Sequence, residues 1–344
     1  MAEARVLVAG NFHWQAGFSQ TVAAYVEAAG EAGCEVRVSG PLSRMDEQIP
    51  RHLPVEPDVR WGTHLVFMFE ARQYLSDEQI ELACSFPRDR RLIIDFDGHW
   101  GGVATADDSS VGTHSIENWR RLYSALSDLV LQPKLTGPLP DGAEFFPCFG
   151  MPQLVRHPRE LGPERDYELQ YIGSNWGRWK PFIEVVEAAR QARLRRIRVC
   201  GRWWDGETCP GFEDITSGEP ERLSGVEVQP PVPFGHVVTE MGRAVITPVL
   251  VSPLVADTGL FTARMLETLA SGSLPVLPPE AEFMSSVYEG DVEALTLGSD
   301  PAATLGRLAG DFERHAEIVG QIQDRARARY NYPRLLRELL RFFR

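Results

Sequence analysis

The chain has 344 residues, of which 43% are hydrophobic and 24% are charged, with 30 glycines and 25 prolines. This composition is typical of a globular protein and excludes disordered, collagen-like and disulfide-scaffold chains. The 35 basic and 48 acidic residues give a formal charge of −13, which argues against binding of nucleic acid through its phosphates. The length predicts roughly two domains.

Targeting signals and cysteine chemistry indicate the compartment. No charged segment precedes a long apolar stretch near residue 1, and no apolar run reaches the ~18 residues that span a bilayer. The five cysteines are scattered, with no Cys-x-x-Cys pair, so free thiols are expected without a zinc site or disulfides. We predict a cytoplasmic protein without stable membrane insertion. Only two lysines occur, Lys134 and Lys180.

The first part of the chain alternates between strand and helix patterns. Short apolar runs predict strands at residues 5–9, 35–38, 63–69, 91–96 and 128–132. Amphipathic patterns predict helices at residues 19–32, 76–85 and 116–127. This alternation favours a parallel sheet with helices on both faces.

A stretch rich in proline and glycine, residues 133–163, predicts the approach to a linker, with a domain boundary near residue 160. The alternation then resumes. Strands are predicted at 168–172, 196–200, 225–228, 244–248 and 274–277, and helices at 179–193 and 261–271. Residues 301–344 predict helix with a break at Tyr332 and Pro333.

These elements predict an α/β protein with two doubly wound, Rossmann-like domains that face a cleft. The expected domains are residues 1–160, residues 161–325, and a C-terminal helix, residues 326–344, that packs back on the N-terminal domain. Ligands of such sheets bind at the carboxyl ends of strands and at helix N-termini, and four segments fall at such places.

The first segment, residues 171–180, follows a strand and opens a helix. Gly173 and Gly177 allow a tight turn with exposed N–H groups, and Arg178 and Lys180 can place positive charge beside a diphosphate. The alternative is an ordinary turn with a solvated basic pair.

The second segment is the helix predicted at 261–271. Asp257 or Thr258 can cap it, Gly272 can end it, and the first turn, with Gly259 and Thr262, offers N–H groups to an anion.

Arg264 and Glu267 lie three residues apart on one face of the same helix. Glu267 is suited to accept hydrogen bonds from a vicinal diol such as a ribose. The alternative interpretation is a surface ion pair.

The helix reads R-x-x-E-x-x-A-x-G-x-x-P-V, which resembles the donor-site signature of GT-B glycosyltransferases of the family-4-type and CgeB-like (spore-maturation-type) group. Residues 173–180 are similar to the Gly-Arg…Lys turn of the same enzymes. The resemblance covers residues 165–285 well and the N-terminal half in architecture.

The resemblance implies a nucleoside-diphosphate-sugar donor, and UDP or dTDP is the expected nucleotide. We expect no cofactor, and no metal because the second half already carries a phosphate site that needs none. It assigns the 161–325 domain to the donor and the 1–160 domain to the acceptor. The donor-binding residues it implies are Gly173, Asn175, Arg178, Lys180, Thr262, Arg264 and Glu267. Retaining members carry a second glutamate where this chain has Gly259, which leaves the stereochemical outcome open.

The third segment is the loop after the first strand, which faces the cleft in GT-B enzymes. Its His13 suits a general base at neutral pH, and Asn11 and Gly17 are the expected acceptor-binding residues. The alternative is a structural histidine.

The fourth segment is a polar cluster just past a predicted strand. Asp95, Asp97 and His99 suit deprotonation or positioning of an acceptor. Asp-x-Asp after an apolar strand is also a metal motif, so Asp95 and Asp97 could instead hold Mg²⁺ or Mn²⁺. A purely structural loop is the third possibility.

The predicted activity is transfer of a sugar from a nucleotide-sugar donor to a small acceptor, such as a natural product, without a metal ion. The alternatives are a sugar-nucleotide epimerase of the same fold and a non-catalytic binding or assembly relative. We predict no nucleic-acid partner, and the oligomeric state is left open.

Overall fold

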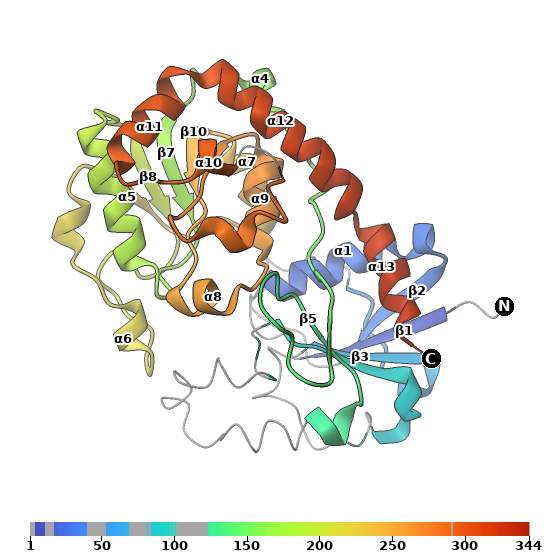
Figure 1. Cartoon of the computed structure of the whole chain (residues 1–344). Helices are drawn as coiled ribbons and strands as arrows, with labels where there is room; N and C mark the ends of the chain where they lie inside the picture. Colours follow the sequence, from blue (N-terminus) through green and yellow to red (C-terminus); the bar gives the residue numbers. More distant parts are fainter. Residues whose placement is uncertain are drawn as a thin grey trace. The chain divides into compact units, whose positions relative to one another are not determined.

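The computed structural model in Figure 1 describes residues 4–10, 17–39, 53–68, 81, 84–96, 98, 100, 123–289 and 292–343. Two compact units make up the chain. Unit 1 contains Met1–Gly150, Thr258–Phe261 and Arg329–Arg344, and unit 2 contains Met151–Asp257 and Thr262–Ala328. The chain thus first changes unit at residue 150, whereas the sequence placed a boundary near residue 160.

Unit 1 is built on a six-stranded parallel sheet in the order β2-β1-β3-β4-β5-β6. Its strands are β1 (Ala4–Ala9), β2 (Cys34–Ser39), β3 (His64–Met68), β4 (Arg91–Ile94), β5 (Val130–Gln132) and β6 (Ala143–Phe145). The central strands are nearly continuous apolar runs because helices or chain segments cover both faces of a parallel sheet. All four residues of β4 are buried.

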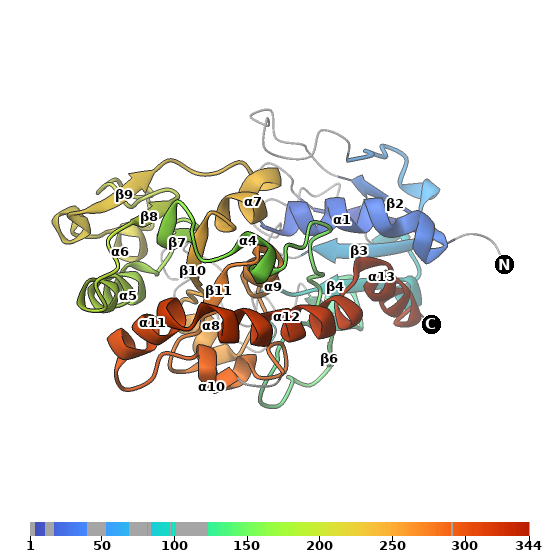
Figure 2. The same cartoon turned by 90° about the horizontal axis from the view of Figure 1, so that it is seen from above.

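Helix α13 (Tyr332–Arg341) returns to unit 1 and packs against α1 (Gly17–Ala32), as Figures 1 and 2 show. Leu335, Leu336 and Leu339 form its buried face. The Tyr25 hydroxyl of α1 donates a hydrogen bond to the Cys148 carbonyl at 2.6 Å. The predicted return of the C-terminal helix to the N-terminal domain is confirmed.

A short segment from the second half of the sequence, Thr258–Phe261, also belongs to unit 1. Leu260 forms an antiparallel bridge with Lys134, and the Phe261 N–H donates to the Pro133 carbonyl at 2.7 Å. The chain therefore enters unit 1 for four residues and leaves it again.

Unit 2 contains a five-stranded parallel sheet in the order β11-β10-β7-β8-β9. The strands are β7 (Tyr167–Ile172), β8 (Ile197–Cys200), β9 (Val226–Gln229), β10 (Ala244–Pro248) and β11 (Leu274–Val276). The chain moves from β7 outward to β8 and β9, and then returns to the other side of β7 as β10. The carboxyl ends of β7 and β10 therefore flank the topological switch point.

The connections between these parallel strands carry the helices of unit 2. Helix α5 (Trp179–Gln191) packs against α11 (Pro301–Gly310), and α7 (Val237–Met241) packs against α9 (Ala263–Ser271). The remaining helices are α4 (Pro158–Leu161), α6 (Glu213–Thr216), α8 (Pro253–Thr258), α10 (Val292–Leu295) and α12 (Phe312–Arg329), the last ending in unit 1. The predicted α/β class with two Rossmann-like domains is confirmed.

Three of the differences between the observed and the predicted elements follow. The edge strand β6 lies inside the stretch assigned to a linker, because proline and glycine on both sides hide a strand of three residues. Asp257 and Thr258 end α8 and do not cap the next helix, whose N-cap is Thr262. The break in the C-terminal helices falls just before Tyr332, since Asn331 caps α13 and Pro333 occupies its first turn.

Candidate donor-binding site

The candidate site lies at the carboxyl edge of the unit 2 sheet. Two loops meet there, one leaving β7 and one leaving β10, on either side of the switch point. A Cβ added at Gly177 would lie 3.5 Å from the Cβ of Ser252, so these loops are in contact. Ligands of open α/β sheets bind at this position because two loops diverge and leave a crevice.

The loop after β7 is held tightly against the end of β8. The Gly173 N–H donates to the Cys200 carbonyl at 2.8 Å, and the indole N–H of Trp204 donates to the Gly173 carbonyl at 2.7 Å. A Cβ at Gly201 would lie 2.2 Å from the Gly173 oxygen, so only glycine permits this approach. The loop is therefore a rigid platform at the start of α5.

Asn175 has a different environment from that of a solvent-facing binding residue. Its side chain is fully buried. The amide Nδ2 donates to the carbonyls of Trp203, Thr216 and Ser217 at 3.2, 2.8 and 3.2 Å. These bonds tie the loop after β7 to the segments that follow β8, which fixes the loop's shape.

Arg178 and Lys180 stand at the beginning of α5. Arg178 is the N-cap residue, and no side chain caps the helix. Its Nη1 donates to the Ser174 carbonyl at 3.3 Å, while its buried Nε has no hydrogen-bond partner. Lys180 is exposed. The first turn therefore presents uncapped N–H groups beside two positive side chains, which is the arrangement that binds anions.

Helix α9 starts in a similar way at the end of the loop after β10. Thr262 is its N-cap residue, but its hydroxyl makes no capping bond, and the buried Oγ1 has no hydrogen-bond partner. Gly272 ends the helix in the left-handed conformation at φ +77°, as predicted. The first turn of α9 thus also retains free donors.

Arg264 and Glu267 form an ion pair on α9 with 3.1 Å between Nη1 and Oε2. Their side chains are only 21% and 16% exposed, so the pair is not a solvated surface bridge. The Arg264 guanidinium also lies 5.9 Å from the ring centroid of Tyr171 on β7. The pair is therefore held at the switch point, with the Glu267 carboxylate oriented by Arg264.

Gly259 stands at the position where the resemblance to retaining GT-B enzymes predicts a second glutamate. Its φ is +65°, and a Cβ there would lie 2.3 Å from the Thr136 Oγ1 within unit 1. A glutamate fits neither this backbone conformation nor this space.

The candidate acceptor residues lie in unit 1. Asn11, His13, Asp97 and His99 fall outside the described residues, and Gly17 begins α1. Asp95 follows β4 and is fully buried. Its Oδ2 accepts hydrogen bonds from the Trp100 N–H at 2.9 Å and from Gln132 Nε2 at 2.6 Å, so Asp95 joins Trp100 to the end of β5.

An aromatic cluster beside the donor loop was not predicted. The Trp176 ring is 5.5 Å from that of Trp203 and 4.9 Å from that of Phe212, and Trp176 is 36% exposed. Trp203 has φ +65°, which is rare for a bulky residue. The signal in the sequence that could have found this cluster is the adjacent pair Trp203–Trp204, of which Trp204 is fully buried.

Metal-binding clusters and membrane-spanning helices are both absent from the described ranges. There, no three or more His, Cys, Asp or Glu side chains group so as to hold a metal ion. None of the helices in those ranges is long and apolar enough to cross a bilayer. All five cysteines are described and are free thiols.

No protein-family model matches the chain, and no curated protein matches it. Solved structures do match the chain. An alpha-glucosyltransferase in complex with UDP and a 13-mer DNA containing an HMU base has a TM-score of 0.64 at 10% identity, covering 99% of this chain and 100% of that chain. An alpha-glucosyltransferase with UDP-glucose and DNA containing an abasic site has a TM-score of 0.62 at 9% identity, with 99% of both chains covered.

The T4 phage BGT in complex with UDP and Mn²⁺ has a TM-score of 0.55 at 12% identity, covering 97% of this chain and 99% of that chain. At these identities the similarity defines the fold. The chain has the GT-B fold of glycosyltransferases over its full length.

Proposed function

We propose that this protein is a glycosyltransferase that binds a nucleoside-diphosphate sugar in unit 2 and transfers the sugar to a small acceptor. The observation that carries the proposal is the pair of uncapped helix N-termini beside the switch point. The buried Arg178 Nε and Thr262 Oγ1 both lack a protein partner there. Helix N-termini with free N–H groups beside positive side chains bind anions, and a diphosphate is the anion of matching charge in a nucleotide sugar.

The proposed donor contacts follow from charge and position. Arg178, Lys180 and the N–H groups of the two first turns hold the diphosphate, and Thr262 donates its hydroxyl. Positive charge at this place stabilises the leaving group as the glycosidic bond breaks, and such electrostatic stabilisation is usually the strongest single contribution to catalysis. Gly173 and Asn175 support this site by shaping the loop.

Glu267 is proposed to accept hydrogen bonds from the ribose hydroxyls of the nucleotide. Its ion pair with Arg264 orients the carboxylate, because the guanidinium occupies one oxygen and leaves the other available. UDP is the nucleotide best supported, since the full-length structural neighbours contain UDP or UDP-glucose. dTDP differs only in the sugar and one methyl group of the base and is the second choice.

The acceptor is proposed to bind unit 1 near Asn11 and Gly17. His13 is the proposed general base, followed by Asp97, and His99 is a further candidate, while Asp95 holds the chain that follows β4. Gly259 replaces the second glutamate of retaining relatives, which favours an inverting reaction in which a base takes the acceptor proton. The positive side chains and N–H groups proposed to hold the diphosphate can neutralise its charge as a metal ion would, so we propose a metal-independent reaction.

Two neighbouring structures contain DNA, but a small acceptor suits this chain better. Its formal charge of −13 opposes the approach of a polyanion.

The decisive variant is Lys180→Ala. The ammonium group is exposed and contributes no core packing, so its loss should leave the fold intact. We expect turnover, measured as release of nucleoside diphosphate from its sugar nucleotide, to fall by about 100-fold or more, as when a group that stabilises transition-state charge is removed.

Lys134→Ala is the matched control, because Lys134 is the only other lysine and donates to the Pro138 carbonyl in unit 1. Near-normal turnover in Lys180→Ala would refute the diphosphate assignment. An epimerised sugar nucleotide formed without any acceptor would identify an epimerase in place of a transferase.

A further inference from the structure

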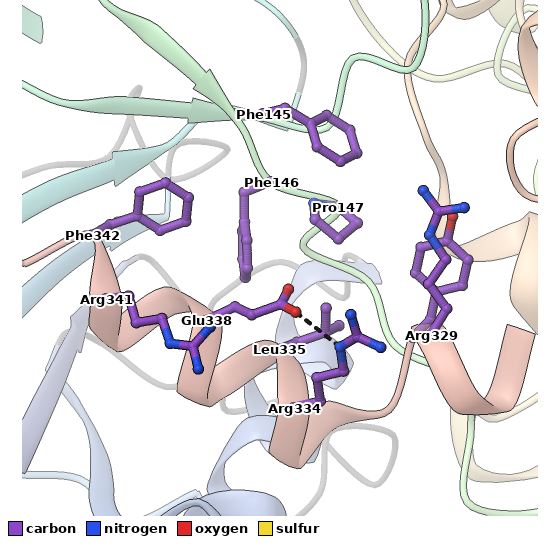
Figure 3. Close-up of a pocket in the computed structure, with 10 residues that line it drawn as sticks. Phe145, Phe146, Pro147, Arg329, Arg334, Leu335, Glu338, Arg341 and Phe342 are labelled. Atoms are coloured by element: carbon purple, nitrogen blue, oxygen red, sulfur yellow. Dashed lines mark hydrogen bonds and ion pairs between the residues drawn. The ribbon is translucent and has the colours of Figure 1, made fainter.

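Unit 1 contains a pocket between the carboxyl end of β6 and helix α13, with a volume of about 370 Å³. Figure 3 shows how its side chains lie. Three phenylalanines and three arginines contribute to its lining, namely Phe145, Phe146, Phe342, Arg329, Arg334 and Arg341. Its volume lies at the lower end of the range for small-molecule sites, roughly 300–1,000 Å³.

The pocket carries excess positive charge. Among the described residues that line it, Glu338 carries the only carboxylate. Arg334 Nε donates to Glu338 Oε1 at 2.9 Å, as the dashed line in Figure 3 marks. The described lining thus has one carboxylate and three guanidinium groups, and the Arg341 guanidinium forms no hydrogen bond or ion pair with any described residue.

This charge contrasts with that of the whole molecule. Residues 325–344 contain seven arginines and one glutamate, whereas the complete chain has a formal charge of −13. The apolar face of α13 packs into unit 1, so folding does not use these arginines as core residues. Positive charge concentrated in one segment of an acidic protein indicates an anionic ligand.

The other side of the pocket is apolar. Phe146 is buried, and its ring packs edge-to-face on that of Phe342 with 6.0 Å between centroids. Phe145 is 39% exposed, one of few large hydrophobic side chains so exposed among the described residues. A fixed aromatic floor with an exposed ring at its edge suits an apolar group of similar size.

We infer that this pocket binds the phosphate group of a ligand that also carries an apolar or aromatic part. Guanidinium groups bind phosphate through paired hydrogen bonds, and the phenylalanine rings would cover the attached group. A free phosphate ester and a lipid headgroup share this chemistry. The pocket belongs to unit 1 and the candidate donor site to unit 2, so the inference does not depend on the proposed transferase activity.

Phenyl phosphate and inorganic phosphate are the soluble probes, each titrated calorimetrically into the full-length protein. The lipid source is tested by co-sedimentation with phosphatidylcholine vesicles prepared with and without phosphatidylglycerol. The pocket variant is Arg329→Gln/Arg341→Gln. Its matched control, Arg314→Gln/Arg327→Gln, removes the same charge from exposed positions of α12.

We expect the pocket variant to weaken phenyl phosphate binding by about tenfold or more, corresponding to the loss of charged hydrogen bonds, and the control to bind as the wild type does. Phe145→Ala should weaken phenyl phosphate binding but not that of inorganic phosphate. Loss of phosphatidylglycerol-vesicle binding in the pocket variant alone would support the inference with a lipid as the source. The inference would be overturned if the wild type bound neither phenyl phosphate nor phosphatidylglycerol vesicles, or if the pocket and control variants bound them equally.

Discussion

Two polar residues of one loop show how the surroundings of a side chain decide its role. Asn175 and Arg178 are three positions apart and were both expected to bind the donor. Asn175 Nδ2 donates to three backbone carbonyls and is buried, whereas Arg178 has one long bond and a buried Nε without a partner. Asn175 Oδ1 is also buried without a partner, but its three backbone bonds make Asn175 a residue that shapes the loop, whereas Arg178 stands at the uncapped start of α5.

Arg165 stabilises unit 2 through buried hydrogen bonds to backbone carbonyls. The residue is 8% exposed, and its guanidinium donates to the carbonyls of Pro158, Gly162, Gly242, Ala244 and Gly272. Burial lowers the pKa of Arg165 to about 10. These bonds join the segment before β7 to the turns before β10 and β11.

Substitution of Arg165 by methionine should destabilise the protein by about 2–4 kcal/mol, because the volume is kept while several buried carbonyls lose their donor. Urea-unfolding curves measure this change. Arg314→Met on the exposed face of α12 is the control and should change the free energy of unfolding by less than about 0.5 kcal/mol. Equal stability of the two variants would contradict a stabilising role for Arg165.

At the scale of elements, the segment between α8 and α9 requires glycine at position 259. The Gly259 carbonyl accepts a hydrogen bond from the Leu135 N–H at 2.8 Å while the residue holds a left-handed conformation. This geometry lets four residues pair with unit 1 before α9 begins. A side chain such as glutamate does not fit at this position, because the backbone is left-handed and Thr136 lies next to it.

Gly259→Ala should lower the free energy of unfolding by about 1–3 kcal/mol, because alanine is strained at positive φ and its Cβ meets Thr136. Gly306→Ala is a control that should have the opposite effect on stability. Gly306 lies inside α11 with nothing within 4 Å of an added Cβ, so alanine should stabilise by roughly 0.5–1 kcal/mol. Thermal unfolding of both variants tests the pair, and a Gly259→Ala protein as stable as wild type would contradict the argument.

At the scale of the whole molecule, the distribution of charge predicts which ligands bind. The chain as a whole is acidic, whereas the candidate donor site at the ends of β7 and β10 in unit 2 presents positive groups, so an anionic nucleotide is expected to bind there. A ligand that binds only the folded state adds to its stability by mass action.

A thermal-shift screen with UDP, dTDP, GDP and ADP, with and without Mg²⁺, tests this expectation. UDP or dTDP at about 100 times its Kd should stabilise the protein by ~2.7 kcal/mol, and Mg²⁺ should not be required. A shift only with Mg²⁺ would favour a metal site that includes Asp95 and Asp97. No shift with any nucleotide would favour a non-catalytic binding protein.

Much of the architecture could be predicted because periodicity and helix signals are local. The strand at Ala244–Pro248 and the helix starting at Trp179 were placed at their observed positions. The edge strand β6 was missed because three half-exposed residues carry no periodic signal. The basic pocket at α13 was missed as well, since it combines β6 with a helix almost 200 residues later in the chain.

The sequence by itself determined the fold class and the chemistry available at the ends of β7 and β10, since alternation, glycine turns and charged residues are properties of neighbouring positions. The tertiary structure decided which of those residues are already engaged. It holds Asn175 and Asp95 in buried hydrogen bonds and leaves Arg178 and Thr262 with unused donors. Hydrogen-bond partners come from distant segments, so only the folded chain shows which polar groups remain for a substrate.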